Sequence, residues 1–190
     1  FWVGFEQAGG SLTLYASNSV DRNFFGFIVP ASFFQSINPL IIILLGPLIA
    51  NFWLRIDRSD HKINTSQKMG IGLILLSAGF FLIMYVNNSN ASYISLWWLV
   101  GVYFLHTLGE LCLSPIGLSM VSKVSPKKIA SLMMGFWFLS AAIANYSAGK
   151  LPTILKSNNI DLFTFLTIMS LIAGIVLISI APLMEKLVRK

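Results

Sequence analysis

Long uncharged apolar stretches divide the chain into segments that are long enough to span a membrane. Residues 23–54 contain no Asp, Glu, Lys or Arg, and residues 69–122 contain a single acid, Glu110. Because a transmembrane helix needs about 20 mainly apolar residues, each stretch can cross the hydrocarbon core at least once. The pattern predicts six helices, over residues 1–17, 30–54, 67–86, 93–122, 129–149 and 161–184.

Proline and polar residues mark the ends of these helices. Pro30 is expected in a first helical turn, where proline is tolerated, and the polar cluster at residues 87–90 separates the third helix from the fourth. The first segment starts without a methionine and carries Glu6 near its beginning. We therefore expect this segment to be only part of a longer helix.

Composition supports an integral membrane protein over a soluble one. Of 190 residues, 56% are hydrophobic and only 11% are charged, and the mean hydropathy is +0.77. Soluble domains usually contain roughly 25% charged residues. The predicted fold class is therefore all-α, an integral membrane helical bundle with no room for a soluble domain. The single cysteine, Cys112, allows no intrachain disulfide.

The basic residues that give the chain its net charge of +6 are unevenly distributed along the sequence. Ten of the 13 Lys and Arg residues lie in segments 55–68, 123–128 and 184–190, which the predicted topology places on one side of the membrane. The positive-inside rule assigns this side, with the C-terminus, to the cytoplasm. The expected partner is thus the lipid bilayer and not a nucleic acid, and the short loops suggest a bacterial inner membrane.

Two acids, Glu6 and Glu110, lie inside predicted helices. A carboxylate at membrane depth costs about 2.5 to 3.5 kcal/mol, so it requires a partner, a proton or water. No obvious lysine or arginine partner lies at this depth, so the partner is a ligand or belongs to helices outside this sequence. We expect a substrate or proton site that faces an aqueous cavity. The alternative is an ion pair that only holds helices together.

Helical spacing places other polar residues near Glu110. His106 and Ser114 lie four residues before and after it, on the same face. Pro115 cannot donate to the carbonyl of Leu111, so a kink is expected there. Broken helices are tolerated in membranes where they line a cavity. For His106, a hydrogen bond to a neighbouring helix is favoured over a role as a proton relay.

A second polar patch lies in the second predicted helix. Gln35 and Asn38 are three residues apart, and Pro39 frees the carbonyl of Gln35, so a kink is also expected at Pro39. Such side chains commonly join helices by hydrogen bonds, so the patch alone does not distinguish packing from a binding site. Trp137 lies deeper than an interfacial tryptophan and is either a core or a ligand-facing residue.

Three motifs resemble, in order and spacing, those of the proton-dependent oligopeptide transporters, a family of the major facilitator superfamily. They are FWVGFEQ at residues 1–7, FQSINP at residues 34–39 and GELCLSPIG at residues 109–117. These motifs resemble the seventh, eighth and tenth helices of that family. The resemblance covers essentially the whole chain and implies a C-terminal six-helix half, with the N-terminal half absent.

The resemblance also implies roles for individual residues. Glu110 would pair with the amino terminus of a peptide, and Asn38 would hydrogen-bond the peptide backbone. Glu6 would pair with an arginine of the N-terminal half and, like Glu110, would take part in proton coupling and gating. The predicted substrate site further includes Ser114, which shares the face of Glu110, and the aromatic residues Trp2, Trp137 and Phe138.

The predicted function is therefore symport of di- and tripeptides with protons by alternating access, in which this chain supplies the half-site for the peptide amino terminus. The proton is the coupling ion, no metal or other cofactor is expected, and the chain is not expected to be an enzyme. Three alternatives stay open: a transporter of the same family for nitrate, a drug or a peptide-like compound; a membrane-embedded transferase; and a purely structural module.

Overall fold

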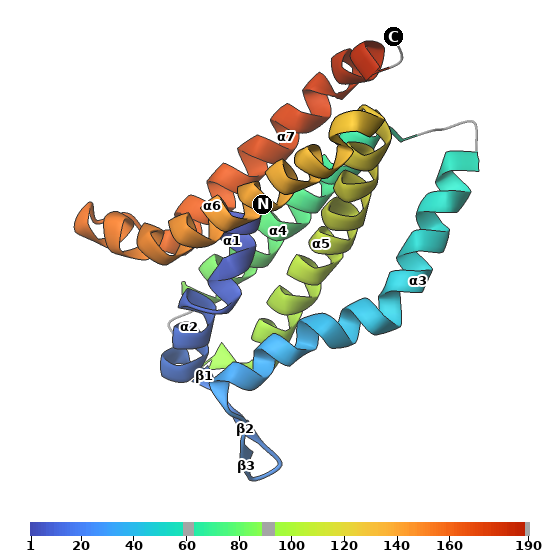
Figure 1. The fold of residues 1–190 in the computed structure, drawn as a ribbon. Coiled ribbons are helices and arrows are strands. Elements are labelled where there is room, and N and C mark those ends of the chain that lie inside the picture. Colours follow the sequence, from blue (N-terminus) through green and yellow to red (C-terminus); the bar gives the residue numbers. More distant parts are fainter. Residues whose placement is uncertain (59–62, 89–93, 189–190) are drawn as a thin grey trace.

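The computed structural model describes residues 1–58, 63–88 and 94–188, which form a bundle of long helices (Figure 1). Within these described ranges, five helical segments are long and apolar enough to cross a membrane: Ala31–Arg58, Thr65–Asn87, Leu96–Val124, Lys127–Ser157 and Leu162–Leu183. The predicted class, an all-α membrane bundle, is thereby confirmed.

The first predicted helix is interrupted, so the expectation of one continuous helix over residues 1–17 is wrong. The segment consists of α1 (Trp2–Phe5), the 3₁₀ helix η1 (Glu6–Ala8) and α2 (Ser11–Ser19). Between η1 and α2, Gly10 takes φ −117° and ψ −94°, outside the helical region. Glycine allows this at little steric cost because it lacks a Cβ atom. The helix is therefore broken at Gly10, and Glu6 is the first residue of the short 3₁₀ helix η1.

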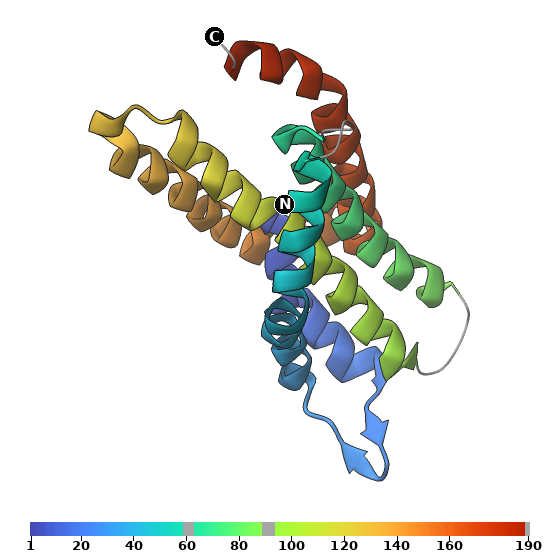
Figure 2. The ribbon, with the colours of Figure 1, turned by 90° about the vertical axis from the view of Figure 1, so that its right-hand side faces the viewer.

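Short strands connect the helices at one end of the bundle. β1 (Val20–Asp21) pairs in parallel with β4 (Ile94–Ser95), and β2 (Asn23–Phe24) pairs antiparallel with β3 (Phe27–Ile28). The β2–β3 hairpin projects from that end in both views (Figure 1, Figure 2). Its turn residues Phe25 and Gly26 both have positive φ, +51° and +85°, as a tight hairpin turn requires. These two-residue strands leave the fold class unchanged.

A 3₁₀ helix that continues into an α-helix follows the hairpin. The 3₁₀ helix η2 (Ala31–Ser36) leads directly into α3 (Ile37–Arg58), and Pro39 lies in the first turn of α3. Pro47 lies deeper inside α3, where it cannot donate to the carbonyl of Ile43. Figure 1 shows that α3 changes direction along its length, which such a proline explains.

The remaining helices all end later in the sequence than predicted. They are α4 (Thr65–Asn87), α5 (Leu96–Val124), η3 (Lys127–Ile129) continued by α6 (Ala130–Ser157), and α7 (Leu162–Val188). Asn64 and Gln67 form a capping box at the start of α4, and Asp161 accepts the Thr164 N–H at 2.8 Å at the start of α7. Tyr93, the predicted start of the fourth helix, lies outside the described residues.

Glycines allow α4 to pack tightly against α5 and α7. A Cβ atom on Gly72 would lie 2.6 Å from the Gly109 carbonyl oxygen, and a Cβ atom on Gly109 would lie equally close to the Gly72 oxygen. On the other side of α4, a Cβ atom on Gly70 would be 3.0 Å from the Gly174 oxygen. Small residues of this kind let helix backbones approach closely in a membrane. By contrast, α3 and α6 bury little of their surface within the described residues.

Candidate functional site

Asn38 and Glu110 meet between α3 and α5. The Asn38 Nδ2 atom donates to the Glu110 Oε2 atom at 2.8 Å and to the Thr107 Oγ1 atom at 3.1 Å. Asn38 and Glu110 are both half-buried. The Glu110 carboxylate is thus oriented by a hydrogen bond while part of its surface stays accessible. The structure therefore brings together two residues that lie 72 positions apart and that the sequence analysis placed in one site.

Thr107 belongs to this polar cluster and was overlooked in the sequence analysis. Its side chain is fully buried, and its hydroxyl donates to the Tyr103 carbonyl at 2.7 Å while it accepts from Asn38. It lies three residues before Glu110, so helical spacing alone places it on a neighbouring position of the same face. With its hydroxyl proton used by Tyr103, its oxygen holds the Asn38 amide in the orientation that reaches Glu110.

Glu6 borders a small cavity that also reaches Asn38. The cavity has a volume of about 190 Å³ and includes side chains from η1, α3 and α5, among them Glu6, Asn38 and Thr107. The carboxylates of Glu6 and Glu110 are close enough for their charges to act on each other. Among the described residues, no cation lies within ion-pair distance of either acid. Both acids thus lie near one amide, and the described residues supply no counter-charge to either.

Gln7 fixes the turn that carries Glu6, although the sequence analysis gave it no role of its own. Its side chain is 2% exposed, and its Nε2 atom donates to the Ala148 carbonyl of α6 at 3.1 Å and to the Val3 carbonyl at 3.2 Å. The Ser11 hydroxyl donates to its Oε1 atom at 2.6 Å. These bonds satisfy polar groups where the helix is interrupted, and they tie η1 to α6.

Trp137 packs against α5 two helical turns beyond Glu110. A Cβ atom on Gly117 would overlap the Trp137 ring, so the ring lies directly on the α5 backbone at that glycine. Gly117 is seven residues after Glu110 and shares its face, with the half-buried Ser114 between them. Trp137 therefore stands beside the face that carries the polar cluster.

The two other aromatic residues of the predicted site differ in their surroundings. Trp2 packs edge-on against the rings of Phe1 and Phe5, with ring centroids 5.4 and 5.6 Å away. The Phe1 ring in turn approaches Gly109 of α5. Phe138 is 63% exposed on α6. The structure thus places Trp2 in a packed aromatic group near α5 and leaves Phe138 on an open face.

His106 is a packing residue between α5 and α4. Its side chain is 2% exposed, its ring lies 4.5 Å from that of Phe80 between centroids, and a Cβ atom on Gly79 would overlap it. Its Nε2 atom has no hydrogen-bond partner among the described residues, and the residue also borders the small cavity beside Glu6. His106 thus lies in an interhelical contact, and the hydrogen bond that the sequence analysis favoured over a proton relay stays a prediction.

The described residues contain no group of three or more His, Cys, Asp or Glu side chains that could hold a metal ion. The candidate site consists of the carboxylates of Glu6 and Glu110, the Asn38 amide, the Thr107 hydroxyl and aromatic walls. Such a set can bind a cation, accept from amide N–H groups, and exchange a proton at either acid.

Comparison with known proteins finds a match to one family and to several transporters. The sequence profile of the POT family matches residues 1–181. Peptide transporter YePEPT of Yersinia enterocolitica is 37% identical over 166 residues, which is 85% of this chain and 32% of the relative. The Di-/tripeptide transporter of Lactococcus lactis is 30% identical over 194 residues, which is 98% of this chain and 39% of the relative.

Solved structures show the same similarity. A crystal structure of a peptide transporter POT in complex with sulfate matches with a TM-score of 0.84 and 33% identity over 96% of this chain and 37% of the other. A POT family transporter in complex with 5-aminolevulinic acid matches with a TM-score of 0.86 and 31% identity, over 96% of this chain and 38% of the other. The chain spans less than half the length of each of these proteins.

Proposed function

Because the chain belongs to the POT family, we propose that it supplies one half of a transporter that moves di- and tripeptides together with protons. The observation that carries the proposal is the 2.8 Å hydrogen bond between Asn38 and Glu110, half-buried and close to Glu6. Both relatives named above, which match most of this chain, carry names that specify peptides. The same comparisons speak against an enzyme.

The polar cluster fits two of the groups that a short peptide presents, its ammonium and its backbone amides. An ionised carboxylate has about four acceptor positions, and Asn38 occupies one of them at Oε2, so Glu110 can still accept from a peptide ammonium. Both Asn38 N–H groups donate within the cluster, to Thr107 and Glu110, so its Oδ1 atom is left to accept from a peptide backbone N–H. Trp137 and Trp2 provide apolar walls that adapt to different side chains.

Proton coupling follows from the two neighbouring acids. When Glu6 and Glu110 are both ionised they repel each other, so a cation that binds at one of them changes the free energy of the charge at the other. Within one conformation, an ammonium at Glu110 therefore lowers the proton affinity of Glu6, and a proton at Glu6 weakens the attraction for the ammonium. Symport by alternating access then requires conformations that differ in how they pair these charges.

The other half of the site is proposed to lie on an N-terminal six-helix bundle. The little-buried helices α3 and α6 offer the apolar surfaces on which such a bundle would pack. The peptide carboxylate requires a base, and the described residues supply none beside Glu110. The complete protein is proposed to lie in a bacterial inner membrane with its C-terminus in the cytoplasm, as the basic residues indicate.

Uptake by the complete protein in liposomes tests this function. We expect labelled dipeptide to accumulate when an inward proton gradient is imposed and only to equilibrate without one. Uptake that does not respond to the gradient would contradict coupling. Nitrate or a peptide-like compound taken up in preference to dipeptides would redirect the substrate assignment, and transport unchanged by Trp137→Ala and Glu110→Gln would support a structural module.

Replacing Glu6 by glutamine is expected to abolish the response to the proton gradient. The amide keeps the size of the side chain but can neither bind a proton nor repel Glu110. Counterflow of labelled against unlabelled dipeptide should continue, since Glu110 and Asn38 are intact. Asp21→Asn, an acid-to-amide change at the hairpin end, serves as the control and should behave as wild type. Gradient-driven accumulation by Glu6→Gln would contradict the proposed role.

Replacing Thr107 by valine is expected to raise the KM for dipeptide about two- to tenfold. The change removes one hydroxyl that orients Asn38, and a neutral hydrogen bond contributes about 0.5 to 1.5 kcal/mol. Thr167→Val is a matched control, because Thr167 is also buried and makes the same bond to a carbonyl four residues earlier, at 2.7 Å, on α7. Equal KM changes in both variants would show a general packing effect.

A further inference from the structure

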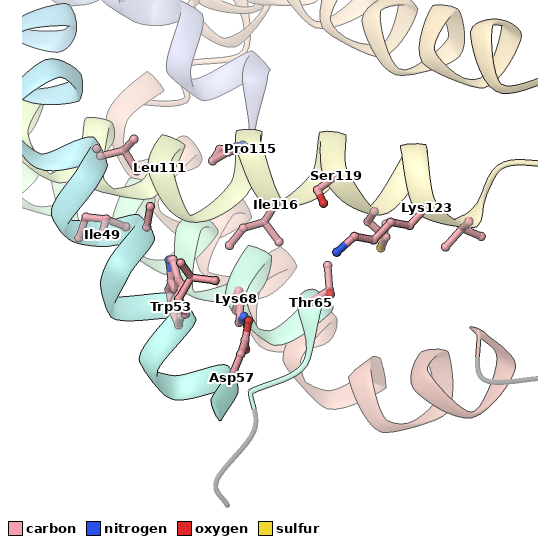
Figure 3. A pocket seen from close by; sticks show the side chains of 15 residues that line it. Ile49, Trp53, Asp57, Thr65, Lys68, Leu111, Pro115, Ile116, Ser119 and Lys123 are labelled. Carbon is pink, nitrogen blue, oxygen red and sulfur yellow. The ribbon is translucent and has the colours of Figure 1, made fainter. Parts of the chain in front are cut away.

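A pocket separate from the polar cluster opens at the basic end of the bundle, between α3, α4 and α5 (Figure 3). Its volume is about 680 Å³. It lies where the second half of α3, beyond Pro47, diverges from α5, and where α4 begins at Thr65. The pocket is therefore a product of the bend in α3, and Leu111 on its wall directly follows Glu110.

The lining has an apolar part and a polar part. Ile49, Trp53 and Leu111 belong to the apolar wall, toward the membrane interior. The polar part lies toward the helix ends, where hydroxyl and ammonium groups gather: Thr65, Lys68, Ser119 and Lys123 (Figure 3). A ligand that fits this lining needs an anionic or hydrogen-bonding head and an apolar tail.

Lys68 is fixed and partly neutralised within the pocket. It is 6% exposed, its ammonium forms an ion pair with Asp57 at the end of α3, and it lies 5.2 Å from the centre of the Trp53 ring. A buried ammonium is stable only when it is paired in this way. Lys68 therefore joins α3 to α4 and adds little net charge.

Lys123 supplies the net positive charge. No carboxylate among the described residues lies within ion-pair distance of it, and Figure 3 shows its side chain extending toward the polar end of the pocket near Ser119 and Thr65. The pocket thus holds two ammonium groups and one carboxylate. Arg55, Arg58, Lys127 and Lys128 lie at the same end of the bundle and raise the local positive potential.

We propose that this pocket binds an anionic phospholipid from the surrounding leaflet. The phosphate would accept from Lys123 and from the hydroxyls of Thr65 and Ser119, and an acyl chain would lie along Trp53. A second cavity of about 280 Å³ lies beside Trp53 and has an apolar lining that includes Ile71 and Leu75, which offers further room for a chain. A free phosphate would leave the apolar wall unused, so the lining favours a lipid. This inference does not depend on peptide transport.

Lipid retention by the complete protein tests the proposal. The protein would be purified from membranes that contain equal amounts of phosphatidylglycerol and phosphatidylcholine, and bound lipids would be counted by native mass spectrometry. We expect wild type to retain phosphatidylglycerol in preference to phosphatidylcholine. Lys123→Gln should lower that retention about fivefold, the effect of one lysine near an anionic surface. Lys128→Gln, at the same end but outside the pocket lining, should leave it within twofold.

Three results would overturn the proposal. Equal losses in Lys123→Gln and Lys128→Gln would show a diffuse surface effect. Thermal stabilisation by inorganic phosphate alone, equal to that by phosphatidylglycerol and lost in Lys123→Gln, would show a site for a free anion. Protection of Ser119→Cys from a thiol reagent in lipid-free detergent would show that another segment of the protein fills the pocket.

Discussion

Replacing Glu110 by glutamine is expected to lower dipeptide uptake about thirtyfold or more. Glutamine has the same shape and can still accept from Asn38, so the local structure should persist. The charge that binds the peptide ammonium is lost, however. Removing one partner of a buried, hydrogen-bonded charge pair costs about 2 to 5 kcal/mol, which corresponds to a factor of about thirty to several thousand in affinity.

The substrate provides the control for this experiment. A dipeptide with an acetylated amino terminus carries no ammonium, so wild type and Glu110→Gln should transport it equally poorly. Asp161→Asn changes an acid that caps α7 at the surface and should leave uptake unchanged. Uptake of the unmodified dipeptide at wild-type rates by Glu110→Gln would remove Glu110 from the substrate site and, with it, the central step of the proposed function.

The membrane helices and both acids could be identified from the sequence because the physical rules involved are local. A run of apolar residues needs no knowledge of its neighbours to be assigned to the bilayer, and a carboxylate inside such a run is conspicuous because of its cost. This logic led to the confirmed fold class and singled out Glu6 and Glu110. It does not require that the arrangement of the helices be known.

The interrupted first helix and the bend of α3 were not predicted. Glycine is common in membrane helices, so Gly9 and Gly10 do not by themselves indicate a break, and the bond from Gln7 to the Ala148 carbonyl of α6 is a long-range contact. Pro47 has no polar residue beside it and was given no role, although the proline rule applies to it and its position inside α3 matters more for the bend than that of Pro39 in the first turn.

The buried members of the cluster depend on which helix faces which. Thr107 and Gln7 look like ordinary polar residues in an apolar run, and their roles appear only when Asn38 or the Ala148 carbonyl is placed opposite them. The same holds for Gly72 and Gly109, whose contact determines the distance between α4 and α5. Since hydrogen bonds and close contacts between helices are non-local, a single sequence contains little information about them.

This close contact leads to a second strong prediction, in which Gly109→Ala impairs both stability and transport. The added Cβ atom would lie 2.6 Å from the Gly72 carbonyl oxygen on α4. A backbone oxygen cannot rotate away as a side chain can, so the two helices must separate. Overpacking of this kind typically costs about 1 to 3 kcal/mol. Any shift of α5 also displaces Glu110, the next residue, and with it the bond to Asn38 and the proposed contact with the peptide ammonium.

Gly101→Ala is the matched control on the same helix. There the nearest atom to an added Cβ, a Leu82 methyl carbon, is 3.7 Å away, which is an ordinary contact. Gly101→Ala should therefore retain wild-type thermal stability in detergent and wild-type uptake, whereas Gly109→Ala should unfold at a lower temperature and transport dipeptide poorly. Gly72→Ala should reproduce the defect from the α4 side, because the contact is reciprocal. If Gly109→Ala behaves like Gly101→Ala in both measurements, α4 does not hold α5 in position, and Glu110 must be positioned chiefly by its bond to Asn38.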